Sequence, residues 1–380
     1  MKYHFLRLLI LVLLSDLFEI KPAAAQDLKP SSNPPSRTYK LGFSPWPWDA
    51  TLEAINWTYA KAIEHGDVIS HHIEEGVPWN EAQSGDPFPK AMQEEVDNRL
   101  RRNANGQVTL LSVNALNTGR DGLAPNRGKN MNEALQAPWS KYDFNKPEVK
   151  LAYANYTERM IKLFHPKWVV IGIESNVLAR KGMDANSKWP AYVELICSTN
   201  RSLKNRGIKI PILVSIVTTA FFPEWSPEDN LKNQQKVLEE LDPCVDGFAV
   251  SAHPFVSGLL ADKFPSDYFS RFFSFSKKWV GISESSYPAQ VWSREGLTWN
   301  GSETKQADFL KKMSIEAQKV KLQFVIWFTV RDFDQLWAGL LRRDSISLVW
   351  RDTGLYSETG APRSGLHIWT NELKKTFDGR

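Results

Sequence analysis

The chain has 380 residues, of which 42% are hydrophobic and 12% aromatic, enough to bury a large core. Its formal net charge of +4 is small for this length, and no long run of lysine and arginine occurs, so a nucleic-acid-binding protein is not expected. The count of 15 tryptophans is high. It fits core packing, but it also fits flat platforms on which sugar rings stack.

The first 25 residues have the pattern of a secretory signal peptide. A positively charged start, with Lys2 and Arg7, precedes an apolar run over residues 8–14, and small residues offer a cleavage site near Ala25. The apolar run is too short to span a bilayer and no other candidate span follows. We therefore expect a secreted or periplasmic protein without a membrane span.

Export from the cytoplasm permits a disulfide. Cys197 and Cys244 are the only cysteines in the sequence, so they are the only pair that could form one. Two free buried thiols are equally ordinary, and the sequence leaves both alternatives open.

Short apolar runs alternate with longer amphipathic stretches along most of the chain, as in repeated β–α units. Residues 26–36, rich in proline and serine, predict a flexible lead-in to this pattern. The first helix is expected over residues 50–64, behind an N-cap at Asp49. Strands are predicted at residues 39–43, 68–72, 108–113, 168–173, 208–216, 247–251, 279–283 and 323–329.

Eight β–α units without a composition break across residues 37–380 predict a single-domain (β/α)8 TIM barrel of the α/β class. A doubly wound open sheet is the alternative, but no glycine-rich phosphate-binding turn follows the first strand. In a TIM barrel the active site lies at the carboxyl ends of the strands, so the residues that follow each predicted strand are the candidates for function.

Two of the predicted strands end on a glutamate. The run WVVIGIESN, residues 168–176, reaches Glu174, and the run WVGISESSYP, residues 279–288, reaches Glu284. Burial explains the apolar residues but not the carboxylates. The fourth and seventh strands are roughly opposed in an eight-stranded barrel, so both glutamates should point into one cleft. A separation of about 5–5.5 Å would suit retaining glycoside hydrolysis; two ion-paired structural glutamates are the other interpretation.

Competing kinds of site are weaker. His71, His72, Glu74 and Glu75 suggest a metal, but neighbours on a strand face opposite ways and the sequence has no H-E-x-x-H helix. The segment around Glu284 is not a serine nucleophile elbow, because a serine stands where that motif needs its second glycine. We therefore expect neither a metal nor a cofactor.

These segments resemble clan A of the retaining glycoside hydrolases, most nearly the arabinogalactan endo-β-1,4-galactanase-like family. Residues 153–176 are similar to the third helix and fourth strand of the clan, residues 247–255 to the sixth strand, and residues 282–288 to the seventh strand. Residues 352–363 resemble the tail that closes these barrels. The resemblance covers most of the mature chain.

The resemblance implies roles for individual residues. Glu174 would be the acid/base and Glu284 the nucleophile. His253 would contact the nucleophile, and Trp327 would form a floor under the sugar at the cleavage point. The implied activity is double-displacement hydrolysis of a β-linked polysaccharide or oligosaccharide, galactan-like or another plant or microbial β-glycan.

Two positions depart from the pattern of the clan. Ile173 stands where the clan has an asparagine directly before the acid/base. The second predicted strand also lacks the usual arginine near the nucleophile, which leaves His71 or His72 for that place. Both changes remove groups that stabilise the transition state, so a weakly active or inactive carbohydrate-binding barrel is the alternative function.

The expected protein is thus a monomer that binds carbohydrate, with Glu174 and Glu284 as its catalytic pair. The aromatic and polar side chains near the predicted strand ends are the candidate substrate-binding residues: Trp46, Trp48, Trp79, Asn114, Asn176, His253, Tyr287 and Trp327.

Overall fold

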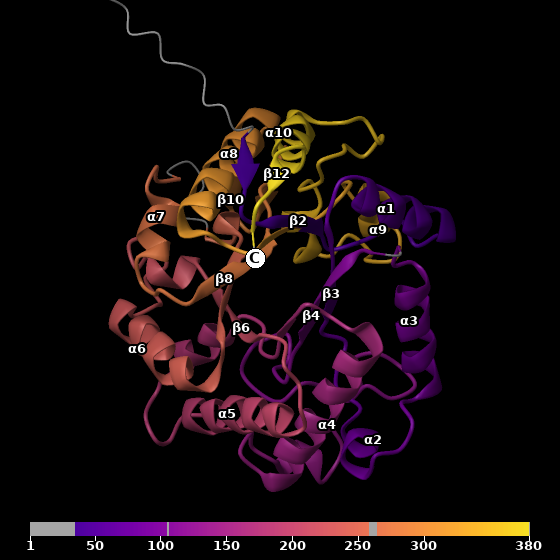
Figure 1. Cartoon of the computed structure of the whole chain (residues 1–380), viewed down its shortest axis with the longest axis vertical. Helices are drawn as coiled ribbons and strands as arrows, with labels where there is room; N and C mark the ends of the chain where they lie inside the picture. The colour runs from indigo at the N-terminus through magenta and orange to yellow at the C-terminus, as the bar shows by residue number, and fades with distance from the viewer. Residues whose placement is uncertain (1–34, 105, 258–263, 380) are drawn as a thin grey trace, which may run out of the picture. The chain divides into compact units, whose positions relative to one another are not determined.

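A closed barrel of eight parallel strands forms the centre of the fold, in the order β11–β2–β3–β4–β5–β6–β7–β8, with helices around it (Figure 1). The computed structural model describes residues 35–104, 106–257 and 264–379; the predicted signal peptide and most of the predicted lead-in lie outside these ranges. The predicted TIM barrel is confirmed. Its strands are β2 (Lys40–Phe43), β3 (Val68–Ile73), β4 (Val108–Val113), β5 (Trp168–Val170), β6 (Ile212–Val217), β7 (Gly247–Ala252), β8 (Trp279–Ser285) and β11 (Phe324–Trp327).

The helices that cover the barrel are α1 (Leu52–Glu64), α2 (Trp79–Ser84), α3 (Lys90–Arg101), α4 (Pro147–Phe164), α5 (Trp189–Asn205), α6 (Leu231–Leu241), α7 (Tyr268–Phe273), α8 (Glu303–Val320), α9 (Asp334–Ala338) and α10 (Ser364–Leu373). The predicted N-cap of the first helix was wrong. Thr51 caps α1 by accepting a hydrogen bond from the backbone N–H of Ala54 at 3.1 Å, whereas Asp49 accepts from the neighbouring Ala50.

Shorter elements complete the chain. A two-residue parallel pair joins β1 (Ser36–Arg37) to β12 (Thr376–Phe377), and β9 (Val291–Arg294) forms an antiparallel hairpin with β10 (Leu297–Asn300). Three short 3-10 helices matter below: η2 (Ser175–Lys181), η4 (Asp242–Cys244) and η7 (Ser347–Trp350).

Strand alternation divides the core into a layer inside the barrel and a larger layer between strands and helices. The inner cluster is Val68, Leu110, Trp168, Val170, Ile173, Leu213, Ala249, Phe324 and Ile326. The rings of Trp168 and Phe324 lie 4.8 Å apart between centroids and fill the interior. Gly42 also faces inward, where a Cβ atom would come within 2.3 Å of the Val68 carbonyl oxygen. The interior of the barrel is thus a packed core.

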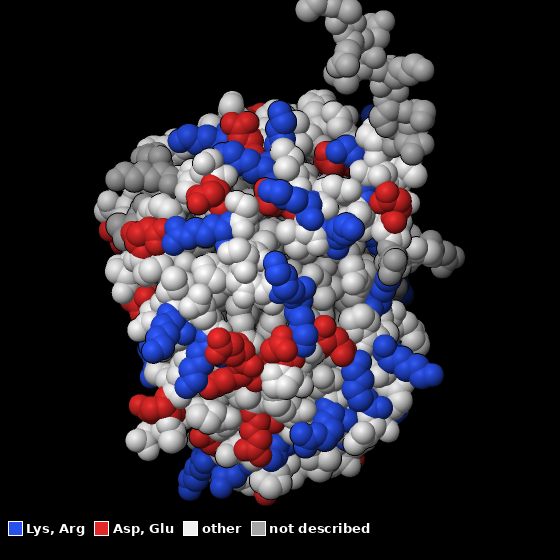
Figure 2. Space-filling model, turned by 60° about the vertical axis from the view of Figure 1, so that its left-hand side comes forward, with Lys and Arg blue, Asp and Glu red and all other residues white. Residues whose placement is uncertain are grey.

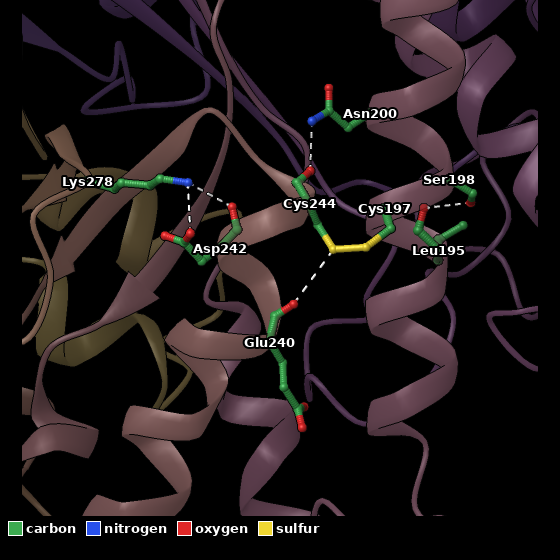
Figure 3. Close-up of a disulfide and its surroundings, with 8 residues drawn as sticks. All are labelled: Leu195, Cys197, Ser198, Asn200, Glu240, Asp242, Cys244 and Lys278. Atoms are coloured by element: carbon green, nitrogen blue, oxygen red, sulfur yellow. Dashed lines mark hydrogen bonds and ion pairs between the residues drawn. A yellow bond between two sulfur atoms is a disulfide. The ribbon is translucent and has the colours of Figure 1, made fainter.

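Cys197 of α5 and Cys244 of η4 form a disulfide that spans 47 residues of sequence (Figure 3). The carbonyl oxygen of Cys244 also accepts a hydrogen bond from the side chain of Asn200 at 2.8 Å (Figure 3). Of the two alternatives that the sequence left open, the structure has the bridge.

Charges of both signs are interspersed on the face drawn in Figure 2, as expected from the small net charge. None of the helices within the described ranges is long and apolar enough to cross a lipid bilayer.

Candidate active site

Glu174 follows β5 in a left-handed backbone conformation, with a φ of 51°. Few residues other than glycine adopt this conformation, and such residues cluster at functional sites. Its backbone N–H donates to the hydroxyl of Ser215 at 2.8 Å. One carboxylate oxygen accepts from the hydroxyl of Ser251 at 2.8 Å, and the other contacts a guanidinium nitrogen of Arg120 at 3.1 Å. Both oxygens of Glu174 therefore have a donor.

Glu284 reaches the same site because β8 is irregular. Val250 pairs with Ile282, but the next residue of β7, Ser251, pairs with Glu284, so the register shifts by one residue at Ser283. Ile282 packs in the outer layer, and strict alternation would turn Glu284 the same way. The bulge instead places Glu284 beside Ser251 on the inner face, which is a common use of bulges next to active sites.

Burial raises the pKa of Glu284 to about 7. The charge of His72, whose Nδ1 atom lies 3.5 Å from the carboxylate, opposes this rise, and the charge of Glu174 adds to it. Strongly perturbed pKa values of this kind cluster at functional sites. The effect of Glu174 on this pKa is consistent with the two predicted glutamates lying near one another at the carboxyl end of the barrel.

Three further charged residues connect the two glutamates. His72 contacts Glu74 through Nε2 at 3.0 Å, and Arg120 contacts Glu74 through Nη1 at 2.7 Å. Glu284, His72, Glu74, Arg120 and Glu174 therefore form one continuous set of ion pairs, which we name the charge network. Burial alone would lower the pKa of His72, but the carboxylates of Glu284 and Glu74 outweigh it and raise the pKa to about 9. His72 is therefore a cation at neutral pH.

The sequence analysis left the position near the nucleophile to either His71 or His72, and in the structure His72 lies beside Glu284. Strand alternation turns His71 outward, where its ring lies 4.7 Å from that of Phe164 and its Nε2 pairs with the Asn103 side chain. Burial lowers the pKa of His71 to about 3, so it is neutral. Glu75 likewise faces away from the cleft and pairs with Arg99 at 3.2 Å.

A cleft of about 240 Å³ opens beside Glu174. Burial lowers the pKa of His253 to about 4, and its Nδ1 lies 2.6 Å from the hydroxyl of Ser286, so a neutral imidazole lines the cleft. A second hollow of about 480 Å³ adjoins the first and shares Thr118 and Gly119 with it. The lining of the cleft is Thr118, Gly119, Arg120, Glu174, Val177, Arg180, Val217, Thr219, Ser251, His253, Val256 and Trp350.

Four predicted substrate-binding residues are too buried to touch a ligand. Trp79 is fully buried and its indole N–H donates to the Ala124 carbonyl, while Asn176 uses its amide to join β6 to α6. Tyr287 packs among aromatic rings of the outer layer. Trp327 faces the helices because it follows Ile326, which points inward. These are core residues in the structure, and the expectation that they contact sugar is corrected.

The remaining predicted residues lie near the strand ends. Asn114 is inside the site, where its amide donates to Glu74 at 2.8 Å. Trp46 is 38% exposed, and its ring lies 5.9 Å from that of Phe328. Trp48 is half-buried, with the guanidinium of Arg331 at 4.0 Å over its ring. Trp46 and Phe328 thus form a partly exposed aromatic pair, whereas Trp327 is buried.

Among the described residues, one cluster of acidic side chains is compact enough to hold a metal ion. It consists of Asp332, Asp334 and Asp352. Arg363 pairs with Asp332, and Arg351 pairs with both Asp334 and Asp352. Two arginines thus pair with the three aspartates, and none of the three aspartates lines the cleft beside Glu174.

The fold and the site together define the class of this protein: a TIM barrel with two glutamates and a cationic histidine at the carboxyl ends of its strands. No protein-family model and no curated protein sequence matches the chain. Solved structures do match, and glycoside hydrolases at low sequence identity are among them.

The GH5_18 protein of Streptomyces cattleya, crystallised with GlcNAc, matches with a TM-score of 0.59 and 13% identity over 91% of this chain and 83% of its own. A fungal β-1,4-galactanase matches with a TM-score of 0.56 and 12% identity over 88% of this chain and 100% of its own. Xylanase 10B of Thermotoga maritima matches with a TM-score of 0.56 and 13% identity over 89% and 95%. The chain is similar to these proteins in fold.

Proposed function

We propose that this protein is an exported glycoside hydrolase that cleaves a β-linked polysaccharide or oligosaccharide. The observation that carries the proposal is the meeting of Glu174 and Glu284 in one charged cluster at the carboxyl end of the barrel. Each glutamate needs an irregular backbone to reach this position: a left-handed residue in one case and a bulge in the other. Core packing alone gives no reason for either irregularity.

The proposed reaction is a double displacement. Glu284 attacks the anomeric carbon and forms a glycosyl ester while the bond to the leaving oxygen breaks, and Glu174 gives its proton to that oxygen. Water then attacks the same carbon, Glu174 takes a proton from it, and the ester bond to Glu284 breaks. The net change is hydrolysis with retention of configuration.

A galactan-like substrate is the finer form of this proposal. The resemblance of the strand-end motifs to the galactanase-like family supports it, as does the similarity in fold to a fungal β-1,4-galactanase. The neighbouring hollows beside Glu174, joined at Thr118 and Gly119, offer room for more than one sugar unit.

The test is hydrolysis of a panel of β-linked glycans, read as new reducing ends, by the wild type, by Glu284→Gln and by Glu75→Gln. Glu75 is the matched control, because it is a strand-end glutamate that pairs with Arg99 outside the charge network. We expect Glu284→Gln to lose turnover by several orders of magnitude and Glu75→Gln to keep it. Full activity in Glu284→Gln would overturn the proposal.

A carbohydrate-binding barrel without activity is the second candidate. Ile173 packs in the apolar interior, where it cannot replace the asparagine of the clan, and Arg120 already occupies one oxygen of Glu174. On this interpretation no glycan of the panel is cleaved, one binds saturably, and Glu284→Gln leaves that binding unchanged.

A further inference from the structure

Glu74 is the middle member of the charge network. Its Oε2 contacts Nε2 of His72 at 3.0 Å, and its Oε1 contacts Nη1 of Arg120 at 2.7 Å. The other nitrogen of His72 faces Glu284 at 3.5 Å, and the other terminal nitrogen of Arg120 faces Glu174 at 3.1 Å. Each candidate catalytic carboxyl is therefore one side chain away from Glu74.

Both carboxylate oxygens of Glu74 already have side-chain partners. Asn114 donates a further hydrogen bond to Oε1 at 2.8 Å, in addition to the contacts with His72 and Arg120. Burial would raise the pKa of Glu74, but the charge of His72 and its hydrogen bond outweigh this and hold the pKa well below its usual range. Glu74 is thus a permanent carboxylate that acts on its neighbours.

We propose that Glu74 is a positioning residue for both candidate catalytic carboxyls, holding His72 beside Glu284 and Arg120 beside Glu174. This inference rests on the proposed hydrolysis for its link to activity. The geometry of the charge network supports it independently, since one side chain makes both contacts.

The number of charges in the network determines which of its carboxyl groups holds a proton. Its three carboxylates face two cations, so one negative charge is uncompensated in a partly buried site. Glu74 and Glu174 each accept hydrogen bonds from at least two side chains, whereas Glu284 has the loose contact with His72. The proton that relieves the excess charge therefore goes to Glu284 in the resting site, and the proposed reaction requires it to move to Glu174, which must donate it to the leaving oxygen.

Removing the charge of Glu74 should lower two pKa values together. A nearby carboxylate stabilises a protonated neighbour, whether that neighbour is an imidazolium or a carboxyl group. In Glu74→Gln the network has two carboxylates and two cations, so both His72 and Glu284 should lose their protons at lower pH. The other charged groups acting on His72 are Glu284 and Arg120, with His253 also close enough to feel its charge.

The experiment follows the imidazole of His72 by NMR titration in the wild type, in Glu74→Gln and in Glu75→Gln. We expect the pKa of His72 to be about 9 in the wild type. It should fall by about one unit or more in Glu74→Gln and stay in place in Glu75→Gln, whose lost carboxylate pairs with Arg99. An unshifted His72 in Glu74→Gln overturns the proposal. An ordinary pKa in the wild type overturns it as well, even if the variant fails to fold.

The pH profile of kcat/KM on the best substrate of the panel distinguishes a positioning role of Glu74 from a purely structural one. If Glu74 has a positioning role, the acidic limb of the kcat/KM profile should lie about one pH unit lower in Glu74→Gln than in the wild type, because Glu284 must ionise to attack. A fall in kcat with the limb unmoved would mean a structural role and overturn the proposal. Because the NMR titration needs no substrate, a shifted His72 without hydrolysis by any form would contradict the proposed function alone.

Discussion

Replacing Glu284 by glutamine should stabilise the protein at alkaline pH, although it should abolish the proposed activity. Glutamine has the shape of the protonated glutamic acid but cannot ionise. The side chain of Glu284 is 18% exposed and lies near Glu174 and Glu74, so its ionised form is unfavourable in the folded chain. This is the usual cost of a site arranged for chemistry and not for stability.

The size of the effect follows from the pKa. Burial raises the pKa of Glu284 from 4.5 to about 7, the charges of Glu174 and Glu74 add to the rise, and His72 opposes it. At about 1.4 kcal/mol per unit, ionisation of this group costs the folded state about 3 kcal/mol more than the unfolded chain. The folded state holds the proton more tightly, so the cost is absent below pH 4.5, grows between pH 4.5 and 7, and is complete above pH 7.

Thermal unfolding followed by tryptophan fluorescence at pH 5 and pH 8 measures this difference. A gain of about 3 kcal/mol corresponds to a rise in Tm of about 4 °C for a barrel of this size. Glu284→Gln should match the wild type closely at pH 5 and exceed it by this amount at pH 8, while the control Glu75→Gln should show no such gain. If Glu284→Gln differs from the wild type equally at both pH values, the reasoning is refuted.

Other predictions concern the disulfide and the apolar positions. Cys197→Ser should lower Tm under oxidising conditions, because the bridge to Cys244 closes a 47-residue loop worth about 4 kcal/mol; a wild type unaffected by reductant would contradict this. Trp46→Ala should weaken glycan binding in a titration with Tm unchanged, whereas Trp327→Ala should cost about 3–5 kcal/mol of stability in thermal unfolding. If Trp327→Ala instead weakened glycan binding with Tm unchanged, Trp327 would be the residue on which the sugar stacks. Ile173→Asn should lower Tm by burying an amide in the inner cluster, without increasing turnover in the reducing-end assay; higher turnover would refute this.

The sequence pattern was sufficient to predict the barrel, because each barrel strand is a short apolar run and the runs alternate with helices along the chain. The strand predicted at 208–216 was too long at its start, since β6 begins at Ile212 after Pro211, which lacks the N–H that a ladder needs. The β9–β10 hairpin was not predicted, because its strands are short and lie outside the barrel.

The candidate site was harder to predict than the fold, because its geometry depends on irregular backbone. Period-two alternation would place Glu284 on the outer face of β8, and the bulge at Ser283 places it on the inner face. Applied to β11, the same alternation would have predicted Phe328, and not Trp327, as the aromatic side chain on the inner face. Arg120 could not be placed at Glu174 from sequence, since a loop with a left-handed residue brings it there. Turn residues around Gly119 were the one signal of that loop.

The pairing of β1 with β12 ties the two ends of the described chain together. Arg37 also contacts Asp67, which immediately precedes β3, so this pair lies at the amino-terminal end of the barrel, opposite the cleft. A linkage to a solid support made at residue 35 or at residue 379 would therefore leave the substrate face open. A few added residues between these two positions would close the chain into a ring, and new termini could then be cut into an outer loop with every barrel strand still in register.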